Sequence, residues 1–199
     1  TQARLWIAQG NLAAANHWAQ RSGLDQAPPP IPYLDEAAYL ALARLRLAEG
    51  NPAVAASLLQ GLHQAAASAD RNGSLIEILI LQAVTYAAQQ QREQALLVLT
   101  QALTLAGGPL GAQGYVRLFV DEGEAMRFLI FDFGFWHPEG TRQQPEAGQN
   151  TNLASYATKI LAGFGNEHPM VDEPLLTEQP KIQNQKSKIK NLIEPLSDR

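Results

Sequence analysis

The sequence has no cysteine, few aromatic residues and no excess of positive charge. Without cysteine the chain can form neither disulfide bonds nor thiolate ligands or nucleophiles. A formal net charge of -4 argues against nucleic-acid binding along the whole chain, because neutralising phosphates requires a basic surface. No apolar run approaches the roughly 20 residues of a membrane span, and the first residues lack a signal-peptide core. We therefore expect a cytoplasmic protein that does not enter membranes.

The motifs that usually mark catalysis or cofactor binding are also missing. No Gly-x-x-x-x-Gly-Lys-Ser/Thr loop occurs, so ATP binding within this chain is not expected. None of the four histidines has a second histidine at metal-ligand spacing. The densest carboxylate cluster, Asp121, Glu122 and Glu124, is more typical of acids at a helix start than of an acid/base pair. We predict no enzyme activity, no cofactor and no metal.

What the sequence does contain is a repeat of about forty residues. The pattern of residues 4–11 recurs at 44–51 and in the same register at 84–91. In each copy a helix-like run ends at a short polar turn, and a second apolar run follows with alanine at an equivalent place. These alanines are Ala15, Ala55 and Ala95. Each repeat is therefore predicted to be a helical hairpin whose two helices approach closely.

The turn residues and apolar stripes agree with this prediction. Gly10 and Gly50 can adopt the left-handed conformation that ends a helix, and Pro52 suits the first position of the next one. One hairpin cannot bury its apolar stripe alone, so the hairpins must stack. The stripe of the second repeat comprises Leu42, Leu45, Ala48, Ala55, Leu58, Leu59 and Leu62. The predicted fold class is all-α, a tetratricopeptide-like superhelix of helical hairpins.

The sequence also indicates how the chain is divided. Repeats occupy residues 1–131, an irregular loop rich in Gly, Pro, Gln and Glu occupies 132–150, and a short terminal helix falls in 151–164. Residues 165–199 have the composition of a flexible linker, and we assign the lysines at 181–190 to it rather than to a DNA contact. Predicted helices lie at 2–9, 12–22, 34–49, 52–69, 74–90, 92–106, 115–120, 124–131 and 153–162. Because residue 1 is threonine, we expect a fragment or a processed product.

Local stretches of the chain resemble a known family of regulators. Residues 74–83, together with 101–106, resemble the last repeats of MalT-like proteins, the large ATP-binding members of the LuxR family of transcription regulators. Residues 114–123 are similar to the segment that closes the helical-repeat domain of that family, and residues 192–199 resemble the entry to a LuxR-type helix-turn-helix. The closing motif identified in this way contains Tyr115, Arg117, Phe119, Asp121, Glu122 and Gly123.

The resemblance implies a regulatory role in a bacterial transcription regulator. The helical repeats would bind a small-molecule inducer or a protein partner and relieve inhibition, so that the nucleotide-bound protein self-associates and activates transcription. DNA would be contacted only through a domain that is absent from this chain. The alternative is a generic tetratricopeptide-like interaction scaffold unrelated to transcription, because the fold alone does not separate the two.

An aromatic run near the end of the repeats is a candidate surface for a partner or ligand. It consists of Phe128, Phe131, Phe133, Phe135 and Trp136. One interpretation is a cap over the last repeat, which a stack of repeats needs for solubility. The other is an exposed binding surface. The sequence leaves both open.

Overall fold

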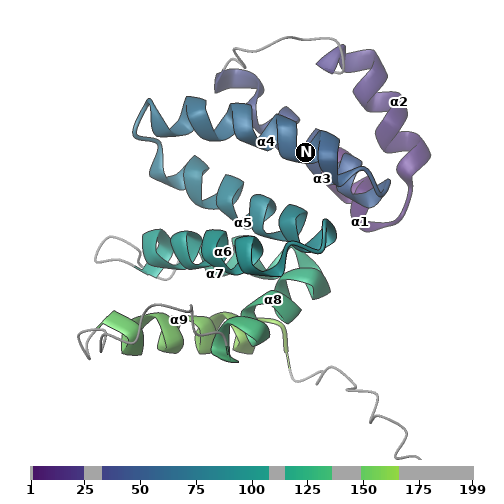
Figure 1. Cartoon of the computed structure of the whole chain (residues 1–199). Helices are drawn as coiled ribbons and strands as arrows, with labels where there is room; N and C mark the ends of the chain where they lie inside the picture. Colours follow the sequence, from purple (N-terminus) through teal and green to yellow (C-terminus); the bar gives the residue numbers. More distant parts are fainter. Residues whose placement is uncertain (1, 25–32, 108–114, 136–148, 166–199) are drawn as a thin grey trace, which may run out of the picture. The chain divides into compact units, whose positions relative to one another are not determined.

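The chain folds into stacked helices in the computed structural model, which describes residues 2–24, 33–107, 115–135 and 149–165 (Figure 1). Within these ranges there is no strand, so the predicted all-α class is confirmed. The helices are α1 (Gln2–Ala8), α2 (Leu12–Ser22), α3 (Glu36–Ala48), α4 (Pro52–Ala67), α5 (Asn72–Ala88), α6 (Arg92–Gly107), α7 (Val116–Val120), α8 (Gly123–Phe135) and α9 (Gln149–Gly163). A short 3-10 turn, η2 (Tyr33–Asp35), precedes α3. None of these helices is both long enough and apolar enough to cross a membrane.

The three turns within the repeats have the same backbone structure. Gly10, Gly50 and Gln90 all have positive φ, at 71°, 75° and 62°. In each turn the following amide donates to the carbonyl five residues back, as Asn11 does to Trp6 at 2.8 Å. This is the helix-ending motif that glycine favours, and glutamine adopts the same conformation in the third repeat. The forty-residue period is therefore visible in the backbone itself.

The hairpins stack so that their first helices form one layer. Helix α1 contacts α3, α3 contacts α5, and α5 contacts α7 and α8. The second helices α2, α4 and α6 pack against these first helices, but in the described part of the chain α4 and α6 do not contact each other. Ala15, Ala55 and Ala95 are completely buried, which confirms their predicted place at the close approach of two helices.

Helix α5 is shared between two hydrophobic clusters. Ile78 and Leu81 belong to the cluster built from α2, α3 and α4, whereas Leu79 and Ala83 belong to the cluster that continues through α6 to α9. Because α5 is apolar almost all round, it joins the N-terminal and C-terminal repeats into one stack. The compact unit formed in this way spans residues 1–166.

Two sequence predictions need correction. Residues at both ends of the predicted loop 132–150 are helical, since α8 continues to Phe135 and α9 begins at Gln149. Helix α9 packs against α6, α7 and α8 and so covers the last hairpin. Ala48 is exposed although the apolar stripe placed it in the core, because it is the last residue of α3, beside the turn. The predicted linker falls outside the described residues, apart from Gly165.

Candidate functional site

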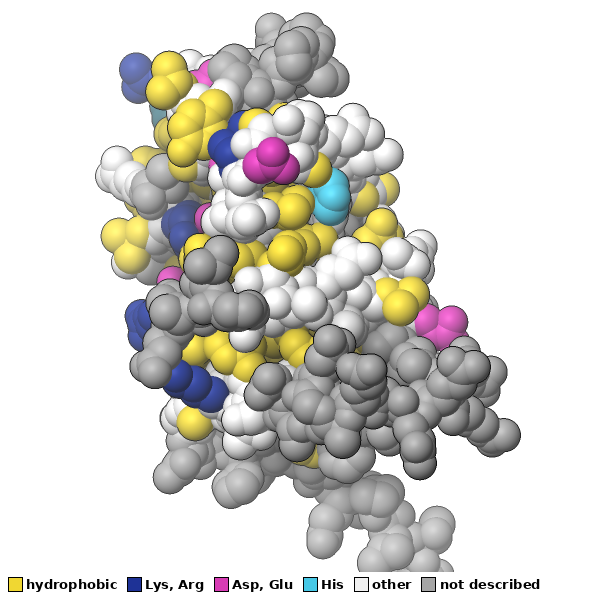
Figure 2. Space-filling view, turned by 90° about the vertical axis from the view of Figure 1, so that its left-hand side faces the viewer, with side chains coloured by type: hydrophobic (Ala, Val, Ile, Leu, Met, Phe, Trp, Pro, Cys, Tyr) yellow, Lys and Arg dark blue, Asp and Glu magenta, His cyan; other side chains and the backbone are white. Residues whose placement is uncertain are grey.

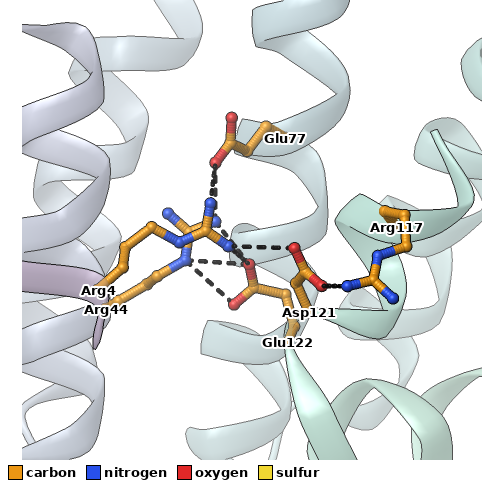
Figure 3. A network of polar contacts seen from close by, with 6 residues as sticks. All are labelled: Arg4, Arg44, Glu77, Arg117, Asp121 and Glu122. Atoms are coloured by element: carbon orange, nitrogen blue, oxygen red, sulfur yellow. Dashed lines mark hydrogen bonds and ion pairs between the residues drawn. The ribbon is translucent and has the colours of Figure 1, made fainter. Parts of the chain in front are cut away.

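A cluster of charged side chains joins four successive elements of the layer of first helices. Arg4 comes from α1, Arg44 from α3 and Glu77 from α5, and the turn between α7 and α8 contributes Asp121 and Glu122. Figure 3 shows both guanidinium groups entering from the same side, with Glu77 above them and the two acids of the turn opposite. We call these five residues the inter-repeat cluster. It brings together residues up to 118 positions apart, from Arg4 to Glu122.

Arg44 is the centre of this cluster. Its Nη2 atom lies 2.5 Å from Oε1 of Glu122 and 2.8 Å from Oε1 of Glu77, and its Nε atom donates to Glu122 at 3.0 Å. The side chains of Arg44 and Glu122 are 9% and 8% exposed. The guanidinium therefore donates two hydrogen bonds to the carboxylate of Glu122 and a third to that of Glu77. The planar guanidinium of arginine is suited to such multiple contacts with carboxylates.

Burial and ion pairing have opposite effects on the charge of Arg44. Burial lowers the pKa of its guanidinium, but the hydrogen bonds and charges of Glu122 and Glu77 outweigh that effect, so the pKa is raised above its ordinary value. Arg44 is therefore charged under all conditions in which the protein folds. A buried charge of this kind is tolerated only with its partners in place.

Arg4 and Arg117 extend the cluster toward solvent. Arg4 lies 3.8 Å from Glu77 and 3.8 Å from Asp121, with its side chain 33% exposed. Arg117, which is 80% exposed, lies 3.5 Å from Asp121 four residues on, as the helical spacing predicts. These outer pairs are longer and better solvated, so each contributes far less than the pair at Arg44.

The predicted closing motif is brought together with these arginines. Asp121 and Glu122 reach back across the stack, and Gly123 has φ 70°, the left-handed conformation that lets α8 follow α7 without a connecting loop. Phe119 is completely buried and meets Tyr156 of α9 edge to face, with ring centroids 6.2 Å apart. Tyr115 is half-buried against the hydrophobic cluster that contains Phe119. The motif thus closes the stack with a buried ring and with two acids.

A second feature is a groove between α4 and α6, with α5 as its floor. It encloses about 610 Å³ and exists because α4 and α6 are not in contact. Its lining is mostly amide and hydroxyl groups. The lining residues are Ala53, Ala56, Ser57, Gln60, His63, Gln64, Gln82, Thr85, Tyr86, Gln94, Val98 and Gln101. We call this the amide groove.

The aromatic run is only partly a cap. Phe133 packs against the core, whereas Phe128 is 53% exposed and Phe131 is 47% exposed on α8. Phe128 borders an apolar groove of about 450 Å³ between α5, α6 and α8, closed at its edge by the ion pair of Arg92 with Asp132. The side chain of Phe135 and all of Trp136 lie outside the described residues.

On the face drawn in Figure 2, hydrophobic side chains lie in bands, with basic side chains toward one edge. Among the described residues no cluster of three or more His, Asp or Glu side chains could hold a metal ion. The arrangement therefore offers hydrogen-bonding and apolar surfaces for a ligand, together with a charged joint between the repeats.

Sequence reasoning found one half of the inter-repeat cluster and missed the other. The family resemblance marked Asp121 and Glu122, but it did not mark Arg4, Arg44 or Glu77. The available signal was an arginine at the same place in two repeats, inside an otherwise apolar stripe. The amide groove was missed as well, because its glutamines lie on helix faces that look like ordinary solvated surface.

Comparison with known protein families identifies one match, to the MalT-like TPR region, over residues 1–132. No curated protein and no solved structure matches the chain. The matched range covers the repeats from α1 into α8, including the turn that carries Asp121 and Glu122. It therefore covers both ends of the inter-repeat cluster and the whole amide groove. The chain belongs to the MalT-like TPR region family.

Proposed function

We propose that this chain is the signal-receiving segment of a LuxR-type transcription regulator. In this role the repeats bind a small-molecule inducer or a protein partner, and the bound state is passed to nucleotide-binding and DNA-binding modules. Membership of the MalT-like TPR region family supports the regulatory role. Tetratricopeptide-like repeats bind other molecules on their extended surfaces, so the proposal is one of binding and not of catalysis.

The amide groove is the observation that carries this proposal. It is built from α4 of one repeat and from α5 and α6 of the next, so one ligand would contact two repeats at once. A ligand shifts a conformational equilibrium only if it binds the two states with different affinity. A site whose two walls belong to different repeats meets that condition, because any change in the packing of the repeats changes the width of the groove.

The inter-repeat cluster gives a route by which such a change could travel. Arg44 lies on α3, which packs against both α4 and α5, and its carboxylate partners lie on α5 and in the turn before α8. A shift of α5 relative to α4 would therefore alter the ion pairs that join the first repeats to the closing motif. Coupling through a packed, charged joint of this kind has a free energy of about 1–3 kcal/mol in many proteins.

The proposal can be tested by thermal denaturation of the chain with a panel of neutral sugars, amino acids, nucleosides and capped peptides. A compound present at one hundred times its Kd stabilises the folded state by about 2.7 kcal/mol, which raises Tm by about 5 °C or more. The double variant Gln60→Ala/Gln101→Ala should bind about tenfold more weakly, so the shift should fall to about half. It should persist in full in the control Gln20→Ala, since exposed Gln20 lies on α2 away from the groove.

The regulatory part of the proposal needs a transcription readout. The gene that encodes this chain, with its flanking sequence, would be assayed with a reporter in cells that carry the double variant or the control. Loss of the response to the stabilising compound in the double variant alone supports the proposal. An unchanged response, or a panel with no stabilising compound, contradicts signal reception at this groove.

One observation favours the alternative of an interaction scaffold. Phe128 exposes about half of its surface next to an apolar groove, and Phe131 on the same helix is exposed to a similar extent. Exposed aromatic side chains are typical of contacts between proteins. If this surface pairs two copies of the chain, sedimentation should show dimers at micromolar concentration that Phe128→Ser abolishes. A chain that stays monomeric at all concentrations tested would remove this support for the alternative.

A further inference from the structure

We infer that the amide groove binds an uncharged peptide segment in an extended conformation, held by hydrogen bonds from glutamine side chains to the peptide backbone. The inference rests on the proposed function in one respect, that a signal binds in this groove, and goes further by naming the chemistry of that signal.

The groove is lined without any charged side chain. None of its lining residues is Asp, Glu, Lys or Arg, although arginines and acids are abundant elsewhere on the described surface. A charged ligand group would lose hydration on entering the groove and find no ion-pair partner, which costs several kcal/mol. The lining therefore selects against phosphates, carboxylates and ammonium groups and favours a neutral ligand.

The polar groups that are present match the peptide bond. Five glutamines line the groove, and each primary amide offers a carbonyl acceptor and N–H donors. A peptide group also offers one acceptor and one donor, so an amide can pair with the backbone in both directions. Small side chains at Ala53, Ala56 and Ser57 allow a main chain to approach the wall formed by α4.

The side chain of Gln82, at the floor of the groove, is already held in place by hydrogen bonds. Gln82 on α5 is held by His63 on α4, with 3.2 Å between its Oε1 and Nδ1 of the histidine, and its amide nitrogen donates to the carbonyl of Leu59 at 3.5 Å. Among the described residues, Gln60, Gln64, Gln94 and Gln101 have no such partner. The ordered floor loses little entropy when a ligand binds, and the four available amides can turn to form hydrogen bonds with it.

The shape of the groove suits a chain more than a ring. The α4 wall runs from Ala53 to Gln64, about 16 Å along a helix that rises 1.5 Å per residue, which matches about five residues of extended peptide at roughly 3.3 Å each. Tyr86 is the one aromatic residue in the lining, so a sugar ring would find little surface on which to stack. An extended pentapeptide is therefore favoured over an oligosaccharide of equal polarity.

The test uses nuclear magnetic resonance of the full chain, observing the side-chain NH2 signals of its glutamines. Each groove signal is assigned by the Gln→Ala variant that removes it, and alanine keeps these exposed helical positions folded. Three probes are titrated: capped neutral pentapeptides of Ala, Ser, Leu, Val and Gln, the same peptides with a central Asp or Lys, and neutral oligosaccharides. We expect the capped neutral peptides to shift the signals of Gln60, Gln64, Gln94 and Gln101, and a central charge to weaken binding by about tenfold or more.

Gln60→Ala/Gln101→Ala should weaken binding of the capped peptides by about tenfold, because two hydrogen bonds are lost, whereas Gln20→Ala should leave it unchanged. Two results overturn the inference and leave the proposed function standing: oligosaccharides that shift the groove signals while peptides do not, or charged peptides that bind as well as neutral ones. If no probe shifts the groove signals although a compound stabilises the chain, the signal binds elsewhere and the inference fails. If nothing binds at all, the inference and the proposed function fail together.

Discussion

Replacing Glu122 by glutamine should destabilise the chain far more than replacing any exposed acid, because it removes the main partner of a buried arginine. Removing one partner of a buried ion pair typically costs about 3–5 kcal/mol. Here Glu77 still lies 2.8 Å from Arg44, and glutamine can still accept one hydrogen bond, so we expect about 2 kcal/mol for Glu122→Gln. For a chain of this size that corresponds to a fall in Tm of about 4–8 °C.

The assay is urea denaturation followed by far-UV circular dichroism, with Glu93→Gln as the matched control. Glu93 is exposed in the first turn of α6 and forms no ion pair with any described residue, so its replacement should change stability by about 0.5 kcal/mol or less. A double-mutant cycle of Arg44→Met with Glu122→Leu separates the pair from its surroundings. The double variant should be more stable than the sum of the single effects predicts, since neither Arg44 nor Glu122 is left without the other and Glu77 keeps Arg4 at 3.8 Å. Equal stability losses for Glu122→Gln and Glu93→Gln would refute the reasoning.

Three further predictions concern the backbone and the C-terminal hairpin. Gln90→Gly should stabilise the chain by about 1 kcal/mol in the same urea assay, because glycine adopts the left-handed conformation without strain; a loss of stability would contradict this. Gly163→Ala should loosen the packing of α9 despite alanine's helix preference, because a Cβ there would lie 2.9 Å from Cγ2 of Val120. The amides of α9 should then exchange hydrogen faster, and unchanged protection would show that Val120 can move aside. Tyr156→Phe should be neutral or stabilising by up to about 1 kcal/mol at pH 7, because the buried hydroxyl has no partner among the described residues. Burial, and secondarily Tyr115, raises the pKa of Tyr156, so its contribution to stability is full below the unfolded pKa of about 10 and is lost as pH rises through the higher folded pKa. The phenylalanine variant should therefore keep more of its stability above pH 10, and identical pH profiles would contradict the assignment.

The fold could be predicted because its determinants are local. A glycine at positions 10 and 50 specifies the turn, and an alanine at equivalent places in three repeats specifies the close helix contact. Both signals recur every forty residues, so each copy supports the others. The end of α8 and the start of α9 were harder to place, because glycine, proline and glutamine near residue 140 hide where helical periodicity begins and ends.

The inter-repeat cluster could be predicted only in part, because ion pairs between repeats have no period. Arg44 pairs with Glu77 and Glu122 at separations of 33 and 78 residues, and neither distance is a multiple of the repeat. Arg4 and Arg44 occupy the same repeat position, but both pair with Glu77 of α5 and with acids of the closing turn.

The position of the inter-repeat cluster follows from the end of the stack, where the last repeat does not have a neighbouring repeat on both sides. An inner repeat is held on both sides by apolar neighbours, whereas α7 is a short helix of five residues that must hold the closing turn against α5. Its buried Phe119 anchors one side, and Glu122 anchors the other by reaching Arg44 on an earlier repeat. Because that pair is buried and charged, it holds only one arrangement of the repeats and weakens sharply when the geometry changes. A stack closed by this ion pair has a defined closed state, which is what the proposed regulatory role requires.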